Sequence, residues 1–286
     1  MAPGWTDYKK YVQYQTYDIT DMLTEGQNAV GAVVGNGWYS GYVSITGNNH
    51  YGTDEAFLGK IVLTYADGSV ETIGTDTNWQ AYLNGPWVET DNQNGETYDA
   101  RLEVPGWAEP NFKGKGWINT KIATSSSIQT EVKPETVALV AQPEEPVQEI
   151  EYLNARFLAK TAEDTYVYDL GQNITSVVRV NVEGEAGTTM KLRFGEMVYK
   201  DTNALYTANL RSAKATDYYT LKGDENGETY QPALTFHGFR YFEISGLGYQ
   251  LAEEDVIGVV IHSKLDRTGY VETNNALVNQ LFSNII

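Results

Sequence analysis

The 286-residue sequence contains no cysteine, which excludes disulfide bonds, thiolate metal sites and cysteine nucleophiles. It is also poor in basic residues: 20 Lys and Arg stand against 38 Asp and Glu, for a formal net charge of −18. A chain this acidic repels phosphate backbones and anionic headgroups, so we expect neither nucleic acid nor membrane as a partner. No apolar run approaches the ~18 residues of a membrane-spanning helix.

Motifs of common catalytic sites are absent as well. The three histidines have no paired spacing for zinc, and no serine lies in a Gly-x-Ser-x-Gly elbow. A P-loop and a G-x-G-x-x-G pattern are also missing. Adjacent acids such as Asp54-Glu55 cannot flank one glycosidic bond on a strand, because neighbouring side chains point to opposite faces. His237, between Phe236 and Gly238, fits a packed, hydrogen-bonded ring better than a catalytic base.

What the sequence does contain is a succession of short β-prone runs separated by Gly, Asn and Asp, which predicts an all-β fold. Leu58 to Tyr65 and Val70 to Ile73 flank an Asp-Gly pair and predict a hairpin. The apolar run Asn28 to Val34 predicts a buried central strand. Val177 to Val182 and Met190 to Phe194 predict a second hairpin.

Further strands are expected in the second half, and the residues between the halves differ in composition. These strands are Tyr218 to Lys222, Ala233 to Phe236, Tyr241 to Ile244 and Val256 to Ile261. Lys133 to Glu149 is rich in Pro and Glu, which predicts an extended linker or edge connection. We therefore expect one β-sandwich in residues 1–147 and a second in residues 148–268.

The last residues, 269–286, have a different pattern. Ala276, Leu277, Leu281 and Ile285 recur at helical spacing behind a polar cap, which predicts the start of an amphipathic helix. Its apolar stripe has no partner in the pattern, so self-association through this helix, or capture of another chain, is a hypothesis. The first five residues lack a basic start and an apolar export segment, and we expect a cytoplasmic location.

Several longer motifs resemble one family. In the first half they are Trp5 to Tyr8 (WTDY), Gln15 to Asp21 (QTYDITD), Gly35 to Gly41 (GNGWYSG) and Gly95 to Arg101 (GETYDAR). In the second half they are Tyr168 to Asn173 (YDLGQN), Tyr206 to Asp217 (YTANLRSAKATD) and Phe236 to Tyr241 (FHGFRY). In this order they resemble bacterial α-L-rhamnosidases of glycoside hydrolase family 78.

The resemblance implies a jelly-roll-like amino-terminal sandwich, short of its first strands, then a concanavalin-like sandwich and the first helix of an (α/α)6 catalytic barrel. It also implies that the acid and base carboxylates of the family lie in that barrel, outside this chain. We therefore expect no catalytic residue here and an inactive chain by itself. The natural glycan and the oligomeric state are not deducible from the sequence.

Loops that combine aromatic and polar residues are candidates for sugar contacts, because aromatic rings pack on pyranose C–H faces and polar groups take the hydroxyls. The candidates are Trp5, Asp7, Asn36, Trp38, Tyr39 and Trp87. A core position fits Trp38 at least as well. Asp91, Asn92, Asn94 and Glu96 form a group of oxygen ligands that could hold Ca²⁺. Some binding modules that resemble this sandwich bind L-rhamnose through calcium.

Two functions of different class follow. The first is a non-catalytic portion of an α-L-rhamnosidase that recognises rhamnose-containing glycans and supports the barrel. The second is a structural β-sandwich scaffold, or a partner-binding fragment, without a ligand of its own.

Overall fold

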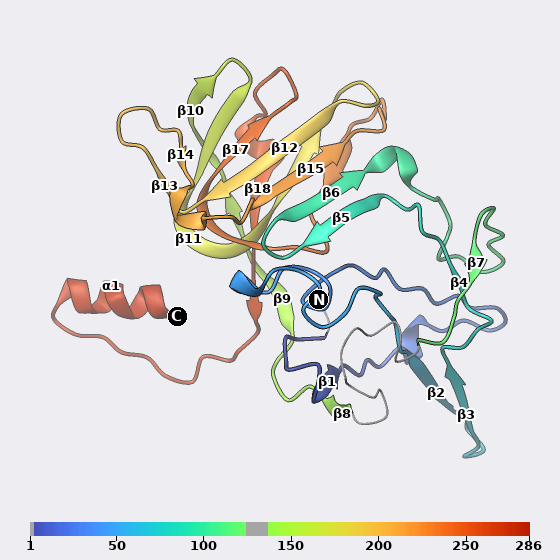
Figure 1. Cartoon of the computed structure of the whole chain (residues 1–286). Helices are drawn as coiled ribbons and strands as arrows, with labels where there is room; N and C mark the ends of the chain where they lie inside the picture. The colour runs from blue at the N-terminus through green and yellow to red at the C-terminus, as the bar shows by residue number, and fades with distance from the viewer. Residues whose placement is uncertain (1–2, 124–136) are drawn as a thin grey trace.

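The computed structural model describes residues 3–123 and 137–286, which are mainly β-strands with a single α-helix among them (Figure 1). The strands of the first half are β1 (Tyr11–Tyr14), β2 (Lys60–Thr64), β3 (Val70–Gly74), β4 (Gln80–Ala81), β5 (Trp87–Asp91), β6 (Gly95–Asp99), β7 (Ile118–Asn119) and β8 (Ala138–Ala141). The all-β class predicted from the sequence is confirmed.

The second half begins at β9 and ends in the helix. Its elements are β9 (Val147–Asn154), β10 (Arg156–Ala162), β11 (Thr165–Val182), β12 (Thr189–Gly195), β13 (Met197–Val198), β14 (Leu205–Tyr206), β15 (Thr216–Thr220), β16 (Glu228–Tyr230), β17 (His237–Ser245), β18 (Val256–Ser263) and α1 (Ala276–Ile285). Short 3-10 turns include η2 (Ser44–Thr46) and η5 (Ala208–Leu210). No helix in the described ranges is long and apolar enough to cross a membrane.

One large curled sheet dominates the fold. Its strands run in the order β5-β6-β15-β12-β17-β11-β18-β9, and β10 and β16 also pair with β11. The 18-residue strand β11 bends in its middle, where Gly171 has φ +81 and the register with β17 shifts between Asp169 and Ile174. Residues before the bend pair with β10, and Ser176 to Val180 pair with β18. One strand therefore belongs to both walls of the sandwich.

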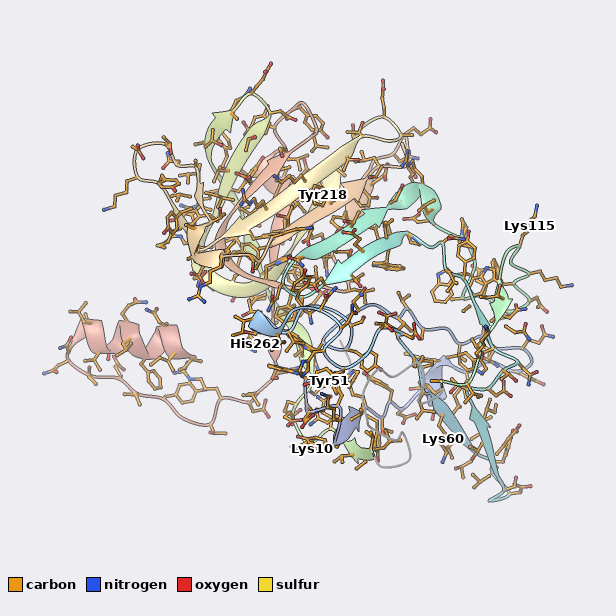
Figure 2. The ribbon with its side chains drawn as sticks, in the orientation of Figure 1. Lys10, Tyr51, Lys60, Lys115, Tyr218 and His262 are labelled. Carbon is orange, nitrogen blue, oxygen red and sulfur yellow. The ribbon has the colours of Figure 1, made fainter. Side chains whose placement is uncertain are left out.

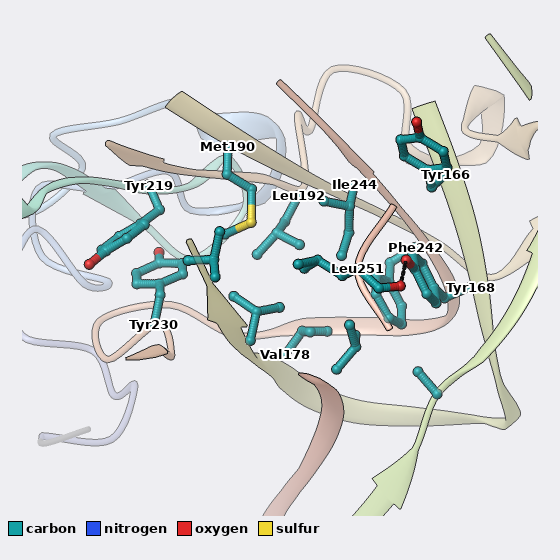
Figure 3. Close-up of a cluster of buried hydrophobic side chains, with 14 of the residues drawn as sticks. Tyr166, Tyr168, Val178, Met190, Leu192, Tyr219, Tyr230, Phe242, Ile244 and Leu251 are labelled. Carbon is teal, nitrogen blue, oxygen red and sulfur yellow. Dashed lines mark hydrogen bonds between the residues drawn. The ribbon is translucent and has the colours of Figure 1, made fainter. Parts of the chain in front are cut away.

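The main core lies between these walls (Figure 3). Inward-facing side chains of β11, β12 and β17 are fully buried: Val178, Val180, Met190, Leu192, Phe194, Phe239, Phe242 and Ile244. Tyr168 stacks on Phe242 at 5.4 Å between ring centroids and donates its hydroxyl to the Leu251 carbonyl at 2.7 Å. Each buried aromatic ring removes a large apolar area from water, so this cluster is the principal source of stability.

The first half is built differently, from short two-stranded pieces. β1 pairs with β8 in parallel, β2 with β3, and β4 with β7. A small cluster of Tyr8, Val43 and Tyr51 lies among its loops, and Tyr51 is labelled in Figure 2. β5 and β6 leave this half and join the large sheet, where β6 runs parallel to β15. The two halves of the chain thus share a sheet.

Predictions were confirmed for elements whose stabilising contacts are close in sequence. The predicted hairpin is confirmed as β2 and β3, joined around Gly68, and the predicted helix is confirmed as α1. Asn275 caps α1, because its side-chain oxygen accepts from the backbone N–H of Leu277 and Val278. The expected linker, residues 133–149, lies partly outside the described residues, and its later part contains β8 and the start of β9.

Three strand predictions were wrong. Residues 28–34 form no strand: they are exposed and irregular, and Gly31 lies so close to the Trp107 ring that a Cβ there would be 2.3 Å away. β11 and β12 exist but do not pair, because β17 lies between them. Residues 233–236 are irregular and lead into β17. In each case a contact distant in sequence decides the structure.

Candidate functional site

A cavity of about 350 Å³ opens where loops of the first half meet the large sheet. Its walls come from residues 44–45, 92–93, 210–213, 215 and 236–238. These segments are η2, the turn between β5 and β6, the loop from η5 to β15, and the start of β17. The cavity is therefore assembled from four segments that are far apart in the sequence.

Asp91 fixes the turn that forms one wall. One carboxylate oxygen accepts from the backbone N–H of Gln93 at 2.8 Å and of Asn94 at 2.7 Å, and the other accepts from Tyr42 N–H at 2.7 Å. Because three N–H donors point at this carboxylate, its charge is compensated inside the protein. Asp91 thus holds the turn in shape and presents the next residue, Asn92, to the cavity.

Asn92 lines the cavity with an unused acceptor. The residue is only 7% exposed, and its side-chain Oδ1 is buried with no hydrogen-bond partner among the described residues. A buried acceptor without a donor costs free energy, roughly 1–3 kcal/mol, and is uncommon in folded proteins. Because a flip of the side-chain amide exchanges Oδ1 and Nδ2, Asn92 can offer either an acceptor or a donor to a group in the cavity.

His237 also lines the cavity and is held in place from two sides. Its Nε2 lies 3.0 Å from Asp217 Oδ1, and its ring stacks on Phe194 at 4.2 Å between centroids. When a histidine is neutral and its Nε2 donates to a carboxylate, the acceptor lone pair is on Nδ1. The packed, hydrogen-bonded ring expected from the sequence is what the structure contains.

Glu96 lies beside this pair and is almost fully buried. Its carboxylate accepts from the Tyr230 hydroxyl at 3.1 Å and from the backbone N–H groups of Ala233 and Leu234 at 3.2 and 2.9 Å. Burial raises the pKa of Glu96 to about 7, helped by the negative charge of Asp217 and opposed by these three donors. Glu96 therefore anchors the segment that leads into β17.

Backbone strain is concentrated around the cavity. Six described residues other than glycine have positive φ, and three of them are Asn, which tolerates this conformation. The other three are Ser44, Arg211 and Ala215, and all of them line the cavity. Such conformations cost about 1–3 kcal/mol each and cluster at functional sites.

An aromatic group adjoins the cavity through Phe236. Trp38 meets Phe236 edge-on at 6.4 Å and stacks on Trp5 at 5.4 Å. Trp5 also donates its indole N–H to the Tyr51 hydroxyl at 3.1 Å. Trp5 is 54% exposed, whereas Trp38 and Tyr39 pack against the small cluster of the first half.

The structure brings together some of the sugar-contact candidates but not all of them. Trp5, Trp38 and Tyr39 form one group. Asp7 makes a surface ion pair with Lys10, and Asn36 exchanges hydrogen bonds with Thr90. Trp87 lies apart, edge-on to Tyr98. The role of these six residues in sugar binding stays a prediction.

The four expected calcium ligands are neighbours in sequence but have different surroundings. The oxygens of Asp91 and Glu96 already accept from backbone N–H groups, and Asn94 Oδ1 accepts from Lys214 N–H at 3.2 Å. Asn92 alone offers a side-chain oxygen without a donor. The described residues contain no group of three or more acids and histidines placed to hold a metal ion. The calcium site stays a prediction.

Sequence reasoning missed Arg211, Ser44 and Phe236 as lining residues. Phe236 and Arg211 lie in two of the motifs that carry the family resemblance, which is the signal that could have found them. Nothing in the local sequence marks Ser44, because its position depends on the folded loop.

Taken by class, the chain is an all-β protein with a curled sheet and an aromatic-flanked cavity. Its family is shown by two matches: residues 1–151 match the alpha-L-rhamnosidase N-terminal domain, and residues 159–262 match the bacterial alpha-L-rhamnosidase concanavalin-like domain. The chain belongs to the bacterial α-L-rhamnosidase family.

Curated relatives agree with this assignment. The alpha-L-rhamnosidase of Streptomyces avermitilis is 45% identical over 285 residues, which cover 100% of this chain and 27% of that protein. The alpha-L-rhamnosidase of Alteromonas sp. (strain LOR) is 33% identical over 287 residues, with 100% and 30% covered. The chain thus spans less than a third of the length of these relatives.

Solved structures show the same arrangement. The Streptomyces avermitilis alpha-L-rhamnosidase complexed with L-rhamnose has 42% identity and a TM-score of 0.88, covering 99% of this chain and 26% of that one. The native enzyme from Aspergillus terreus has 34% identity and a TM-score of 0.85, covering 99% and 32%. The fold described above is therefore that of part of an α-L-rhamnosidase.

Proposed function

We propose that this chain is a non-catalytic portion of an α-L-rhamnosidase that recognises rhamnose-containing glycans and supports the catalytic part of the enzyme. Support comes from relatives named alpha-L-rhamnosidase that match it over its whole length, while it spans only 27% and 30% of theirs. Most of each of these enzymes therefore lies outside the matched region, and that remaining part is long enough to contain the catalytic residues.

The observation that carries sugar recognition is the Asn92 side chain, whose Oδ1 has no hydrogen-bond partner among the described residues, in the wall of a cavity bordered by Phe236. A pyranose offers hydroxyls, which donate and accept, for such an amide and a C–H face for an aromatic ring. We place one rhamnose unit of the glycan in this cavity. Calcium, if it binds, would take the Asn92 oxygen after the side-chain amide turns over, because carbonyl oxygens are ligands that Ca²⁺ accepts.

The observation that favours the supporting role is helix α1. Figure 1 shows it standing apart from the curled sheet, and its apolar side chains are in water: Leu277, Leu281 and Ile285 are all more than half exposed. An apolar stripe of this kind is stabilised by a covering surface. In the full enzyme we assign that surface to the catalytic part.

The test is a titration of the purified chain with L-rhamnose, followed by two-dimensional NMR, first with Ca²⁺ and then with EDTA. We expect saturable shifts for residues around Asn92, and loss of them with EDTA if calcium participates. Asn92→Ala should weaken binding at least tenfold without lowering the melting temperature, because the side chain has no hydrogen-bond partner among the described residues. Asn284→Ala, on α1, is the matched control and should bind normally.

The scaffold hypothesis predicts a different result. A folded sample without shifts at any L-rhamnose concentration, with or without calcium, would contradict sugar recognition and leave the supporting role. We also expect no release from a chromogenic α-L-rhamnoside. Turnover that a single carboxylate substitution abolishes would contradict the non-catalytic assignment.

A further inference from the structure

The bend of β11 is a large bulge in its ladder with β17. The register places residues 170–173 of β11 opposite a single residue of β17, Arg240. The pairings of β11 with β10, β16 and β18 also leave out residues 170–173. The sheet therefore carries an insertion that no neighbouring strand uses. Bulges re-aim side chains and are frequent next to functional sites, so they are treated as designed features.

An ion pair holds the base of this bulge. Arg240 donates from Nε and Nη2 to the two carboxylate oxygens of Asp169, at 2.7 and 2.8 Å. Asp169 Oδ1 also accepts from the backbone N–H of Gly171 at 2.7 Å. Gly171 itself has the left-handed backbone that glycine adopts at little cost, with φ +81. A two-pronged guanidinium–carboxylate contact fixes geometry as well as contributing energy, so the bulge has a set shape.

The bulge presents two amide side chains to the solvent. Gln172 and Asn173 are exposed, whereas Leu170 before them is buried in the main core. Within the described ranges neither amide side chain forms a hydrogen bond. An amide both donates and accepts, so the pair suits a partner surface that carries polar groups of either kind.

Two of the motifs that resemble the family meet at the bulge. Gln172 and Asn173 follow Asp169 in YDLGQN, and Arg240 lies in FHGFRY. The second motif contributes Phe236 and His237 to the cavity, but Arg240 points to a different role at the bulge. In Figure 1 the bend of β11 lies at the end of the curled sheet on the side where α1 stands.

From these observations we infer that the bulge is a docking contact for the catalytic part of the enzyme, and that Gln172 and Asn173 bind polar groups on that part. The inference rests on the proposed function, which assigns the cover of α1 to the same part. The occupant follows from two observations: the chain spans only 27% and 30% of its curated relatives, and α1 stands on the side of the bulge. This polar contact would fix the angle at which the sandwich meets the catalytic part.

The test is hydrogen–deuterium exchange followed by mass spectrometry, on this chain and on the full-length enzyme that contains it. In the full-length enzyme we expect peptides covering residues 169–176 to exchange at least about tenfold more slowly than in the chain alone. Peptides of α1 report the supporting role in the same experiment and should be protected as well. The chain alone is measured at two concentrations to detect pairing with a second copy.

A double variant tests the two amides. Gln172→Ala combined with Asn173→Ala should leave the melting temperature of the chain alone unchanged, because both side chains are exposed. In the full-length enzyme it should raise the exchange of residues 169–176 toward the rate in the chain alone. Asn226→Ala is the matched control: this exposed amide in the turn before β16 contacts Asp224, and its loss should not alter exchange at the bulge.

The outcomes separate this inference from the proposed function. Equal exchange of the bulge in both proteins, with α1 protected in the full-length enzyme, would overturn the docking contact while the supporting role stands. Equal exchange of both segments would overturn both. Protection in the chain alone that grows with concentration would assign the bulge to a second copy instead. Protection that survives the double variant would overturn the role of Gln172 and Asn173.

Discussion

Asp217 Oδ1 lies 3.0 Å from His237 Nε2, and this contact joins β15 to β17 across the intervening strand β12. The same oxygen accepts from the backbone N–H of Glu96 at 2.9 Å. Phe194 of β12 stacks on the imidazole. One buried carboxylate oxygen therefore ties the sheet of the second half to β6 of the first half and holds a wall of the cavity.

Replacing Asp217 by Ala should lower the free energy of unfolding by about 3 kcal/mol, because two buried donors lose their acceptor. Asp217→Asn should cost less, since an amide oxygen can still accept from both. Urea unfolding of the two variants measures the difference. Equal losses would mean that volume at this position, and not the acceptor, is what matters.

Stability should fall as the pH rises from about 4.5 to about 7. The pKa of Glu96 is raised from 4.5 to about 7 in the folded protein, so the folded state holds a proton that the unfolded chain has released. By linkage, ionising this buried carboxyl removes about 3 kcal/mol across that window. The lowered pKa values of Asp169 and Glu228 act below this window, where stability falls with falling pH.

Glu96→Gln provides the control for this pH effect. The amide oxygen can accept from the two backbone N–H groups, and the amide N–H can donate to the Tyr230 hydroxyl, as a protonated glutamic acid would. We expect its melting temperature to be flat from pH 5 to pH 8, while that of the parent chain declines. Parallel profiles would show that other groups carry the pH dependence.

Alanine substitutions at two glycines with positive φ can distinguish the cost of backbone strain from the cost of a steric clash. Gly95 has φ +109, and a Cβ there would lie 2.0 Å from the Thr216 carbonyl oxygen, whereas Gly68 has φ +82 and open space around it. Gly68→Ala should cost about 1 kcal/mol, and Gly95→Ala clearly more, because β6 must move away from β15. Thermal unfolding compares them; similar losses would contradict a close approach at Gly95.

Trp38 and Trp5 stack on each other but should respond differently to truncation. Trp38→Ala should lower stability by about 3 kcal/mol, because this half-buried ring packs against Trp5, Phe236 and the small cluster of the first half. Trp5→Ala should cost about 1 kcal/mol, since the ring is 54% exposed. Melting temperatures test this, and equal effects would contradict the assigned packing.

Elements set by local chemistry could be predicted from the sequence. The Asp67-Gly68 turn specifies the β2–β3 hairpin by itself, and the Asn275 side chain caps α1 two and three residues away. The pairing of Thr97 with Tyr218 could not be predicted, because 121 residues separate them and no local pattern encodes the partner. The same holds for β17, which lies between the two strands of the expected second hairpin.

The candidate site also has a part that local sequence could predict and a part that it could not. Asn92 was named as one of four oxygen ligands that could hold Ca²⁺, and the motif containing Phe236 and His237 was part of the family resemblance. Their meeting with Arg211 in one cavity depends on the folded sheet and on a left-handed backbone at Arg211, which an arginine adopts only when its surroundings impose it. Tertiary contacts, more than residue preference, create this site.

The shared sheet bears on any attempt to produce the second half of this protein alone. A fragment beginning at residue 148 would lack β5 and β6 and leave the outer edge of β15 unpaired. Bare strand edges recruit other chains, so such a fragment would tend to aggregate even with its hydrophobic core complete. Residues 148–286 contain the main hydrophobic core, but β5 and β6 of the first half are also needed to cover the edge of the sheet and keep the protein soluble.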